Sequence, residues 1–347
     1  LTGNGAAADR AFALMRKDVD YRLARVQMQT PDRKFNYVFN RWVPRLIELG
    51  AALGRWGFFG FRDLVQQNQG ALTLGDSPKR RQRLEMAMSH QWPTGYGVRS
   101  FPALHEDSTM KYADSALWLV SAVTEYLKET GNMAFLGHRL PYLGGGEGTV
   151  FQHLTRAMEA LSSGTGRHGL CLIHEGDWCD SMTHVGRKGR GESVWLSEAY
   201  CYACLCMEEL CLHTGHKARA AAYRRQYRKM KDTINRNAWD GRWYRRAYDD
   251  DGKPLGSRSC KQGKIFANAQ SWAMISRIVP PKRLRSAMAE IKRRLRTPYG
   301  YTLFRPAYSY KQDSIGRLTC LEPGTADNAT VYTHGNAFLA VGLLMAL

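Results

Sequence analysis

The 347-residue chain has no apolar run close to the roughly 20 residues that a transmembrane helix needs. The residues after Leu1 also lack the basic, apolar and small-residue sections of a secretory signal peptide. We therefore expect no membrane association and predict a cytoplasmic location; any targeting signal would lie in the part of the product that this chain does not include. Because the chain begins with leucine rather than methionine, we also expect it to be a piece of a longer or trimmed product.

A zinc-ribbon pattern is missing as well. Four of the eight cysteines lie between Cys201 and Cys211 in a stretch with helical periodicity, and there is no second Cys-x-x-Cys pair. Thiols on one helix have the wrong geometry for disulfides with each other. We therefore expect buried free thiols in a reducing compartment and no metal site.

Acidic residues are few relative to basic ones. The 50 Lys and Arg against 31 Asp and Glu give a formal charge of +19, but the basic residues are scattered and accompany no zinc-finger or RNP-type signature. We predict a solvated basic surface rather than a nucleic-acid interface, with part of the charge serving an anionic substrate such as phosphate.

Helical periodicity recurs along most of the chain, whereas strand-like alternation is scarce and is clearest over 243–248. An apolar content of 44% fits a packed globular protein. Glycine- and proline-rich polar loops separate the helical stretches, which indicates an all-α array whose loops carry the chemistry. The clearest predicted helices cover residues 35–54, 108–130, 147–163, 193–214, 216–238, 265–278, 282–295 and 330–346.

A charged amphipathic stretch over 8–28 precedes this array and is broken by the turn residues at 30–32. The break predicts a linker helix within residues 1–30. Residues 31–347 are then predicted to form one helical domain.

The most unusual loop is Gly176-Asp177-Trp178-Cys179-Asp180. An indole face can stack on a pyranose, and a carboxylic acid beside it can protonate a leaving oxygen, so the pattern suits a sugar site. An acid that works near neutral pH needs burial or a neighbouring carboxylate, for which Asp177, Glu175 and Glu192 are candidates. The alternative is that Asp177 or Asp180 caps the following helix.

Two further stretches could bind an anion or sugar. Arg62 and Asp63 stand at a loop-to-helix junction, where they could clamp sugar hydroxyls, or could be a surface arginine beside a helix cap. His334 opens the last apolar helix, where it could hold an oxyanion, or could be a structural histidine.

Together these stretches resemble the catalytic domain of the cellobiose and chitobiose phosphorylases, glycoside hydrolase family 94. The resemblance runs from about residue 8 to the end, and its motifs occur in the family order. They lie at residues 30–32 with 40–42, 60–63 with 66, 114–119, 176–180, 189–196, 252–257, 263–266 with 269–273, 297–300 and 332–334.

The resemblance implies an all-α fold, the (α/α)6 barrel, with the active site at its loop-lined end. It implies that Asp180 is the general acid, that Arg62, Asp63 and Trp178 line the donor sugar site, and that His334 contacts inorganic phosphate. Further substrate contacts are predicted for Asp177, Gln270 and Asp327.

The implied reaction is an inverting phosphorolysis. Phosphate, the co-substrate, attacks the anomeric carbon of a β-linked gluco-disaccharide or oligosaccharide from the face opposite the acid. The product is an α-sugar 1-phosphate. No catalytic base and no other cofactor are implied, because phosphate is already anionic.

The sequence departs from the family at several points. Cys179 stands where the family usually has Asn, and Ser115 where it usually has a second Asp. The chain starts inside the linker helix and stops shortly after His334, so we expect a barrel that is incomplete at its C-terminal end. A partner chain that supplies the missing terminal domains, or a homo-oligomer, would complete it.

Two other functions are open. An inverting hydrolase of the same fold would need a second carboxylate about 6.5–9.5 Å from the acid, for which Asp327 or Glu322 could serve. A non-catalytic carbohydrate-binding subunit would keep the fold without turnover.

Overall fold

The structure is a computed structural model that describes residues 5–53, 59–75, 77–101 and 112–346. Its helices are α1 (Gly5–Ala24), α2 (Arg33–Tyr37), a π-helix (Val38–Trp42), α3 (Val43–Leu53), α4 (Phe61–Leu72), α5 (Ser77–Ser89), α6 (Ser115–Thr130), α7 (Val150–Ser162), α8 (Val194–His213), α9 (Lys217–Asn237), α10 (Ala267–Ile275), α11 (Pro281–Leu295) and α12 (Thr333–Ala346). Short 3-10 helices cover Met133–Gly137 and Arg317–Cys320.

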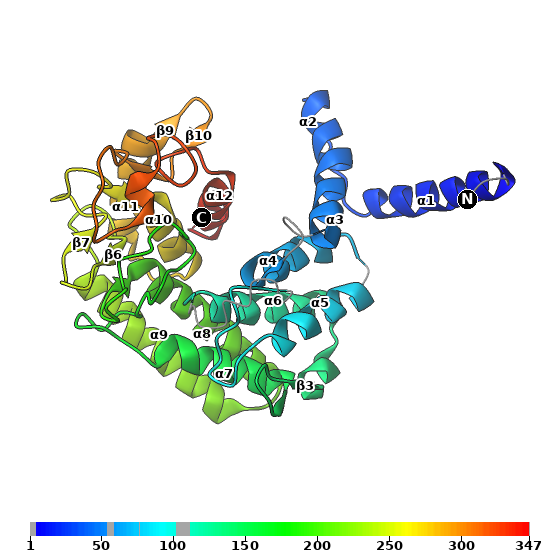
Figure 1. The fold of residues 1–347 in the computed structure, drawn as a ribbon, viewed down its shortest axis with the longest axis horizontal. Helices are drawn as coiled ribbons and strands as arrows, with labels where there is room; N and C mark the ends of the chain where they lie inside the picture. The colour runs from blue at the N-terminus through cyan, green and yellow to red at the C-terminus, as the bar shows by residue number, and fades with distance from the viewer. Residues whose placement is uncertain (1–4, 54–58, 76, 102–111, 347) are drawn as a thin grey trace.

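The helices form two layers. Consecutive even-numbered helices from α4 to α12 pack side by side, and α5, α7, α9 and α11 each pack against the even-numbered helix that precedes them. In Figure 1 this alternation curves around an axis from α4 to α12, while α1 projects away from the body. The helical barrel that the sequence predicted is confirmed.

The strands are two or three residues long and pair antiparallel within the loops. The pairs are β1 (Phe59–Gly60) with β2 (Ser100–Phe101), β3 (Arg139–Pro141) with β4 (Glu147–Thr149), β8 (Ile265–Phe266) with β11 (Phe304–Arg305), and β9 (Arg296–Thr297) with β10 (Gly300–Tyr301). A three-stranded sheet joins β5 (Glu192–Ser193), β6 (Ala247–Tyr248) and β7 (Pro254–Leu255). Because β1, β5 and β8 lead directly into α4, α8 and α10, these sheets gather the loops at one end of the barrel.

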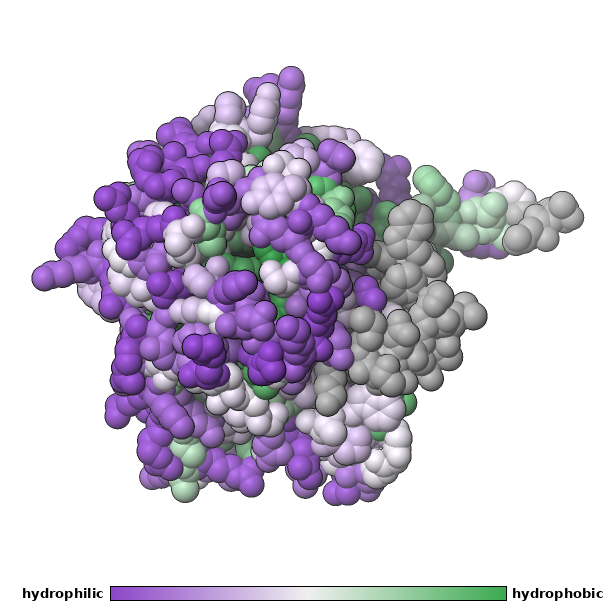
Figure 2. Space-filling view, turned by 60° about the vertical axis from the view of Figure 1, so that its left-hand side comes forward, coloured by the Kyte–Doolittle hydropathy of each residue, from purple (hydrophilic) through white to green (hydrophobic). Residues whose placement is uncertain are grey.

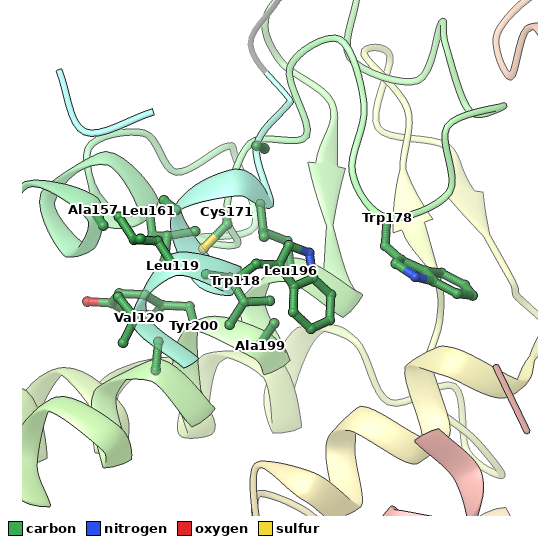
Figure 3. Close-up of a cluster of buried hydrophobic side chains, with 14 of the residues drawn as sticks. Trp118, Leu119, Val120, Ala157, Leu161, Cys171, Trp178, Leu196, Ala199 and Tyr200 are labelled. Atoms are coloured by element: carbon green, nitrogen blue, oxygen red, sulfur yellow. The ribbon is translucent and has the colours of Figure 1, made fainter. Parts of the chain in front are cut away.

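Large aromatic side chains fill the centre of the barrel. Trp118 of α6, Trp195 of α8, Trp272 of α10 and Phe338 of α12 have ring centroids 5.3–6.2 Å apart. Figure 3 shows the neighbouring part of this core, where α6 and α8 pack together and Trp178 lies to one side on its loop. The aromatic core therefore packs directly beneath the loops.

Each predicted helical range contains a helix of the structure, whose ends differ from the prediction by up to three described residues; 54 and 108–111 lie outside the described residues. Helices α4 and α5 were not among the clearest predicted ranges, because their apolar residues are interrupted by polar ones. In the region predicted as one helix over 35–54, a π-helical turn separates α2 from α3.

Polar side chains cover much of the surface in view in Figure 2. Figure 2 shows hydrophilic side chains over most of the face in view, with a small apolar area between them. Among the described residues, no helix combines the length and the apolar character that a bilayer crossing requires.

Candidate active site

Three stretches that are far apart in the sequence meet at the loop end of the barrel. Arg62 is the second residue of α4, Asp114 is the N-cap of α6, and Asp180 lies on the long loop before β5. Arg62 donates from Nη1 to Asp114 Oδ2 at 2.9 Å and from Nη2 to Asp180 Oδ1 at 2.8 Å. One guanidinium therefore joins two helix N-termini to the loop.

Burial differs sharply across this trio. The side chain of Asp114 is 1% exposed and that of Arg62 is 18% exposed, whereas that of Asp180 is 42% exposed. Burial alone would lower the pKa of Arg62, but the two carboxylates outweigh it and hold the pKa above its ordinary value. Arg62 is thus a fixed positive charge with one buried partner and one partner open to solvent.

Asp63 lies in the first turn of α4, beside the N-cap residue Gly60. A Cβ on Gly60 would fall 2.3 Å from Asp63 Oδ2, so the carboxylate folds back over the start of the helix. A negative charge there is favourable for the helix dipole. The half-exposed Asp63 therefore stabilises the helix start that orients Arg62, and the predicted surface arginine is not observed.

Asp177 lies behind the loop rather than on its surface. Its side chain is 0% exposed and accepts hydrogen bonds from Arg246 Nη2 at 2.5 Å, Ser193 Oγ at 2.7 Å and the backbone N of Cys179 at 3.0 Å. With its oxygens committed in this way, Asp177 holds the loop and does not reach a ligand directly.

Neither Asp177 nor Glu192 is the carboxylate neighbour that Asp180 was expected to have. Asp177 is neutralised by Arg246, and Glu192 binds the His168 side chain and the backbone N of Leu170. The charged group that contacts Asp180 is instead the guanidinium of Arg62.

His334 and Trp178 form the other side of the site. The indole N–H of Trp178 donates to His334 Nδ1 at 3.2 Å, and His334 Nε2 lies 3.4 Å from Gln66 Nε2, one turn along α4 from Arg62. An Nδ1 that accepts a hydrogen bond leaves the proton of the neutral ring on Nε2. The protonated Nε2 of His334 then lies beside the side-chain amide of Gln66, which can accept from it only through its oxygen.

Trp178 is only 7% exposed, and its ring lies 5.3–5.6 Å from the rings of Tyr332, His334 and Phe338. The indole thus forms a buried wall of the site, and only a small part of it is available for stacking on a sugar. Its position orients His334.

Two other predicted contacts lie in different surroundings. Gln270 is 1% exposed, and its amide bonds the backbone N and O of Tyr244, so it fixes a loop and is closed to substrate. Asp327 is half-buried and accepts a 2.5 Å hydrogen bond from the hydroxyl of Ser181, the residue after Asp180. Asp327 therefore adjoins the site.

Several residues of the site were not predicted from the sequence. Asp114 and Gln66 lie within recognised motifs, but no role was assigned to them. Arg246 lies within the strand-like stretch 243–248, where alternation places it on the buried side. Tyr112 forms a bridge with Gly176 and, through burial and the charge of Asp180, has a raised pKa.

No group of three or more His, Cys, Asp or Glu side chains suited to a metal ion occurs in the part of the chain that the structure describes.

Solved structures with similar helical arrangements include a sugar epimerase from a ruminal bacterium. It has a TM-score of 0.56 and 13% identity, and the match covers 95% of this chain and 86% of that one. A rhamnosidase of Bacillus sp. GL1 has a TM-score of 0.57 at 14% identity over 76% of this chain and 26% of that one. At these identities the likeness concerns the fold.

Sequence relatives are closer. The chain is 35% identical over 317 residues to the solabiose phosphorylase of Paenibacillus borealis, a match that covers 91% of this chain and 41% of that protein. It is 32% identical over 320 residues to the cellobionic acid phosphorylase of Neurospora crassa, covering 90% of this chain and 40% of that protein. The chain thus spans about two fifths of the length of these curated relatives.

A family model described as the catalytic domain of the glycosyl hydrolase 94 superfamily matches residues 19–346. That match covers nearly the whole chain and includes every residue of the site described above. The chain therefore belongs to the glycosyl hydrolase 94 superfamily.

Proposed function

We propose that this domain is the catalytic part of an inverting glycoside phosphorylase. It would cleave a β-linked gluco-disaccharide or oligosaccharide with inorganic phosphate and release an α-sugar 1-phosphate. The observation that carries the proposal is the placement of the half-exposed Asp180 beside Arg62 on α4, while His334 of α12 contacts Gln66, one turn further along α4. The relatedness to named phosphorylases supports it.

In this proposal Asp180 gives its proton to the glycosidic oxygen as the bond to the anomeric carbon breaks. Asp180 is bound to Arg62 in the structure, so this contact must open before the carboxyl group can face the glycosidic oxygen. A sugar hydroxyl that accepts the Nη2 hydrogen bond of Arg62 would release Asp180, while Nη1 stays bound to Asp114. Substrate binding would then free the acid for the leaving oxygen.

Phosphate would approach from the opposite face, on the side of His334. The Nε2–H of the neutral ring can donate to a phosphate oxygen, and the N-terminus of α12 favours a negative charge. A phosphate oxygen then forms the new bond to the anomeric carbon while the leaving oxygen takes the proton of Asp180. Because phosphate supplies the attacking oxygen already charged, the step needs no general base.

Four other predicted residues would act around Asp180 and His334. Arg62 and Asp63 would contact the donor sugar, Trp178 would border it, and Asp327 would lie near the reacting groups. We also propose that a partner chain or a second copy of this chain contributes further surface to the site. The cysteine pattern favours a cytoplasmic location.

The test is incubation of the purified protein with β-linked gluco-disaccharides in the presence and absence of phosphate. We expect α-sugar 1-phosphate to form in proportion to phosphate, as read by 31P NMR. Free sugars at a phosphate-independent rate would instead support a hydrolase, with Asp327 as the candidate base. Binding of the disaccharide without release of either product would support a carbohydrate-binding subunit.

A further inference from the structure

The loop that carries Asp180 is attached to the body of the protein through one fully buried ion pair. Arg246 and Asp177 are each 0% exposed, and the Ser193 hydroxyl lies between them, 2.7 Å from Asp177 Oδ2 and 3.2 Å from Arg246 Nη1. Asp177 also accepts the backbone N–H of Cys179. Three residues therefore fix the turn that leads directly to Asp180.

Arg246 is itself held by the three-stranded sheet. Its backbone N donates to Leu255 O at 2.8 Å, and its carbonyl accepts from the N of Val194, the first residue of α8, at 3.2 Å. A Cβ on Gly256, whose φ is +73°, would lie 2.6 Å from the Arg246 nitrogen, so the two strands approach closely. The guanidinium is thus anchored to the rigid part of the barrel.

A second carboxyl group is buried next to this pair. Glu198, one turn into α8, is 0% exposed, and Arg246 is among its electrostatic neighbours. In the described part of the chain, neither carboxyl oxygen of Glu198 accepts a hydrogen bond. The Nε of Arg246 also has no acceptor there. Of the two buried carboxyl groups, Asp177 forms the ion pair with Arg246 and Glu198 does not.

The charge of Glu198 follows from its surroundings. Burial raises the pKa of Glu198 well above its ordinary value, and Arg246 offsets this only in part. Its other titratable neighbours, Cys201 and Tyr244, also have raised pKa values because of burial, so they are uncharged near neutral pH. The surroundings of Glu198 therefore favour its uncharged form.

We propose that Arg246 is a positioning residue for the acid Asp180, because it pairs with Asp177 at the start of the acid loop and makes no ion pair with the buried Glu198. An ionised Glu198 would compete for the guanidinium and loosen the loop. The inference rests on the proposed function, because it assigns Asp180 the role of the acid. It predicts that Arg246 affects proton donation to the leaving group although it does not contact the substrate.

The experiment compares Arg246→Met, Arg246→Lys and Glu198→Gln, with Arg245→Met as the matched control. Arg245 is the adjacent arginine and pairs with the buried Asp240 at 2.7 Å instead of with the acid loop. Total bond cleavage is measured as free sugar plus sugar 1-phosphate, for a disaccharide and for a 2,4-dinitrophenyl β-glucoside, whose leaving group needs no proton.

We expect Arg246→Met to lower kcat for the disaccharide about 100-fold, since a displacement of about 1 Å can have that effect, with KM within about threefold. The kcat of this variant for the dinitrophenyl substrate should fall far less. Arg246→Lys, which keeps the charge but not the two-pronged contact, should lie in between. Glu198→Gln and Arg245→Met should keep kcat within about twofold, which follows if neither residue acts on the acid.

Equal losses on both substrates would contradict the positioning role, as would a folded Arg246→Lys variant with wild-type kcat on the disaccharide. A large loss of kcat in Glu198→Gln would contradict its uncharged state. If Arg246→Met does not fold, the Lys and Gln variants still decide the question. A wild-type protein that releases neither product would instead contradict the proposed function.

Discussion

The two sides of the site are held by different kinds of interaction. On the acid side, Arg62 and Arg246 form ion pairs with three aspartates, two of which are almost completely buried. On the other side, His334 accepts the indole N–H of Trp178 and contacts the amide of Gln66, two uncharged groups.

This difference indicates how the two sides can respond to a substrate. Breaking a buried ion pair leaves an uncompensated charge, so the acid side is stiff. A neutral hydrogen bond contributes only about 1 kcal/mol, so the His334 side can adjust when an anion binds. We therefore expect changes on the acid side to reduce turnover with every nucleophile, and changes on the other side to affect phosphate alone.

The largest expected effect comes from Asp180→Asn. Removing the proton donor should lower kcat by about 10³-fold for the disaccharide, whether phosphate or water attacks, because general acid catalysis contributes on that scale. Steady-state rates of sugar 1-phosphate and free-sugar formation measure it. A variant that lost only phosphorolysis would show that Asp180 acts on phosphate and is not the general acid.

The next effect is expected from Arg62→Met. The substitution leaves Asp114 buried without its cation, which should lower the free energy of unfolding by about 3 kcal/mol. It should also lower kcat by about 100-fold, because Asp180 loses its orientation. Urea unfolding and kinetics on the folded fraction separate the two. A variant with normal kcat would show that the ion pair serves stability alone.

His334→Asn tests the neutral side. We expect the KM for phosphate to rise about tenfold, which corresponds to one hydrogen bond to a charged group. Any slow hydrolysis should continue at the wild-type rate. A parallel fall in hydrolysis would show that the two sides are not independent.

Trp178→Phe should have the smallest effect. It keeps an aromatic ring in the wall but removes the N–H that bonds His334 Nδ1, so about 1 kcal/mol of stability should be lost. The KM for phosphate should rise no more than about threefold, since His334 keeps its contact with Gln66. Thermal unfolding and phosphate titration provide the readouts, and a loss as large as that of His334→Asn would mean that Trp178 controls the histidine.

Sequence patterns located the loop ends well. The motifs and the glycine-rich loops placed Arg62 and His334 at helix starts and Asp180 in a loop, and the structure brings all three to one end of the barrel. The boundaries are predictable because helix starts carry local signals that survive in any tertiary context.

Burial was the part that could not be predicted. Asp177 and Asp180 are three residues apart with the same side chain, yet one is 0% exposed and the other 42% exposed. The difference depends on Arg246, 69 residues from Asp177 along the chain, and no local pattern links the two. The burial of Gln270 could not be predicted either, because a side-chain amide can form hydrogen bonds with a sugar hydroxyl or with backbone groups equally well.

The most direct test of the central claim, that Asp180 is the acid on a side separate from phosphate, is the leaving-group dependence of Asp180→Asn. Phosphorolysis of a 2,4-dinitrophenyl β-glucoside needs no proton donor, whereas phosphorolysis of a disaccharide does. The account predicts a kcat loss of about 10³-fold for the disaccharide and less than about tenfold for the dinitrophenyl glucoside. Equal losses for the two substrates would contradict it.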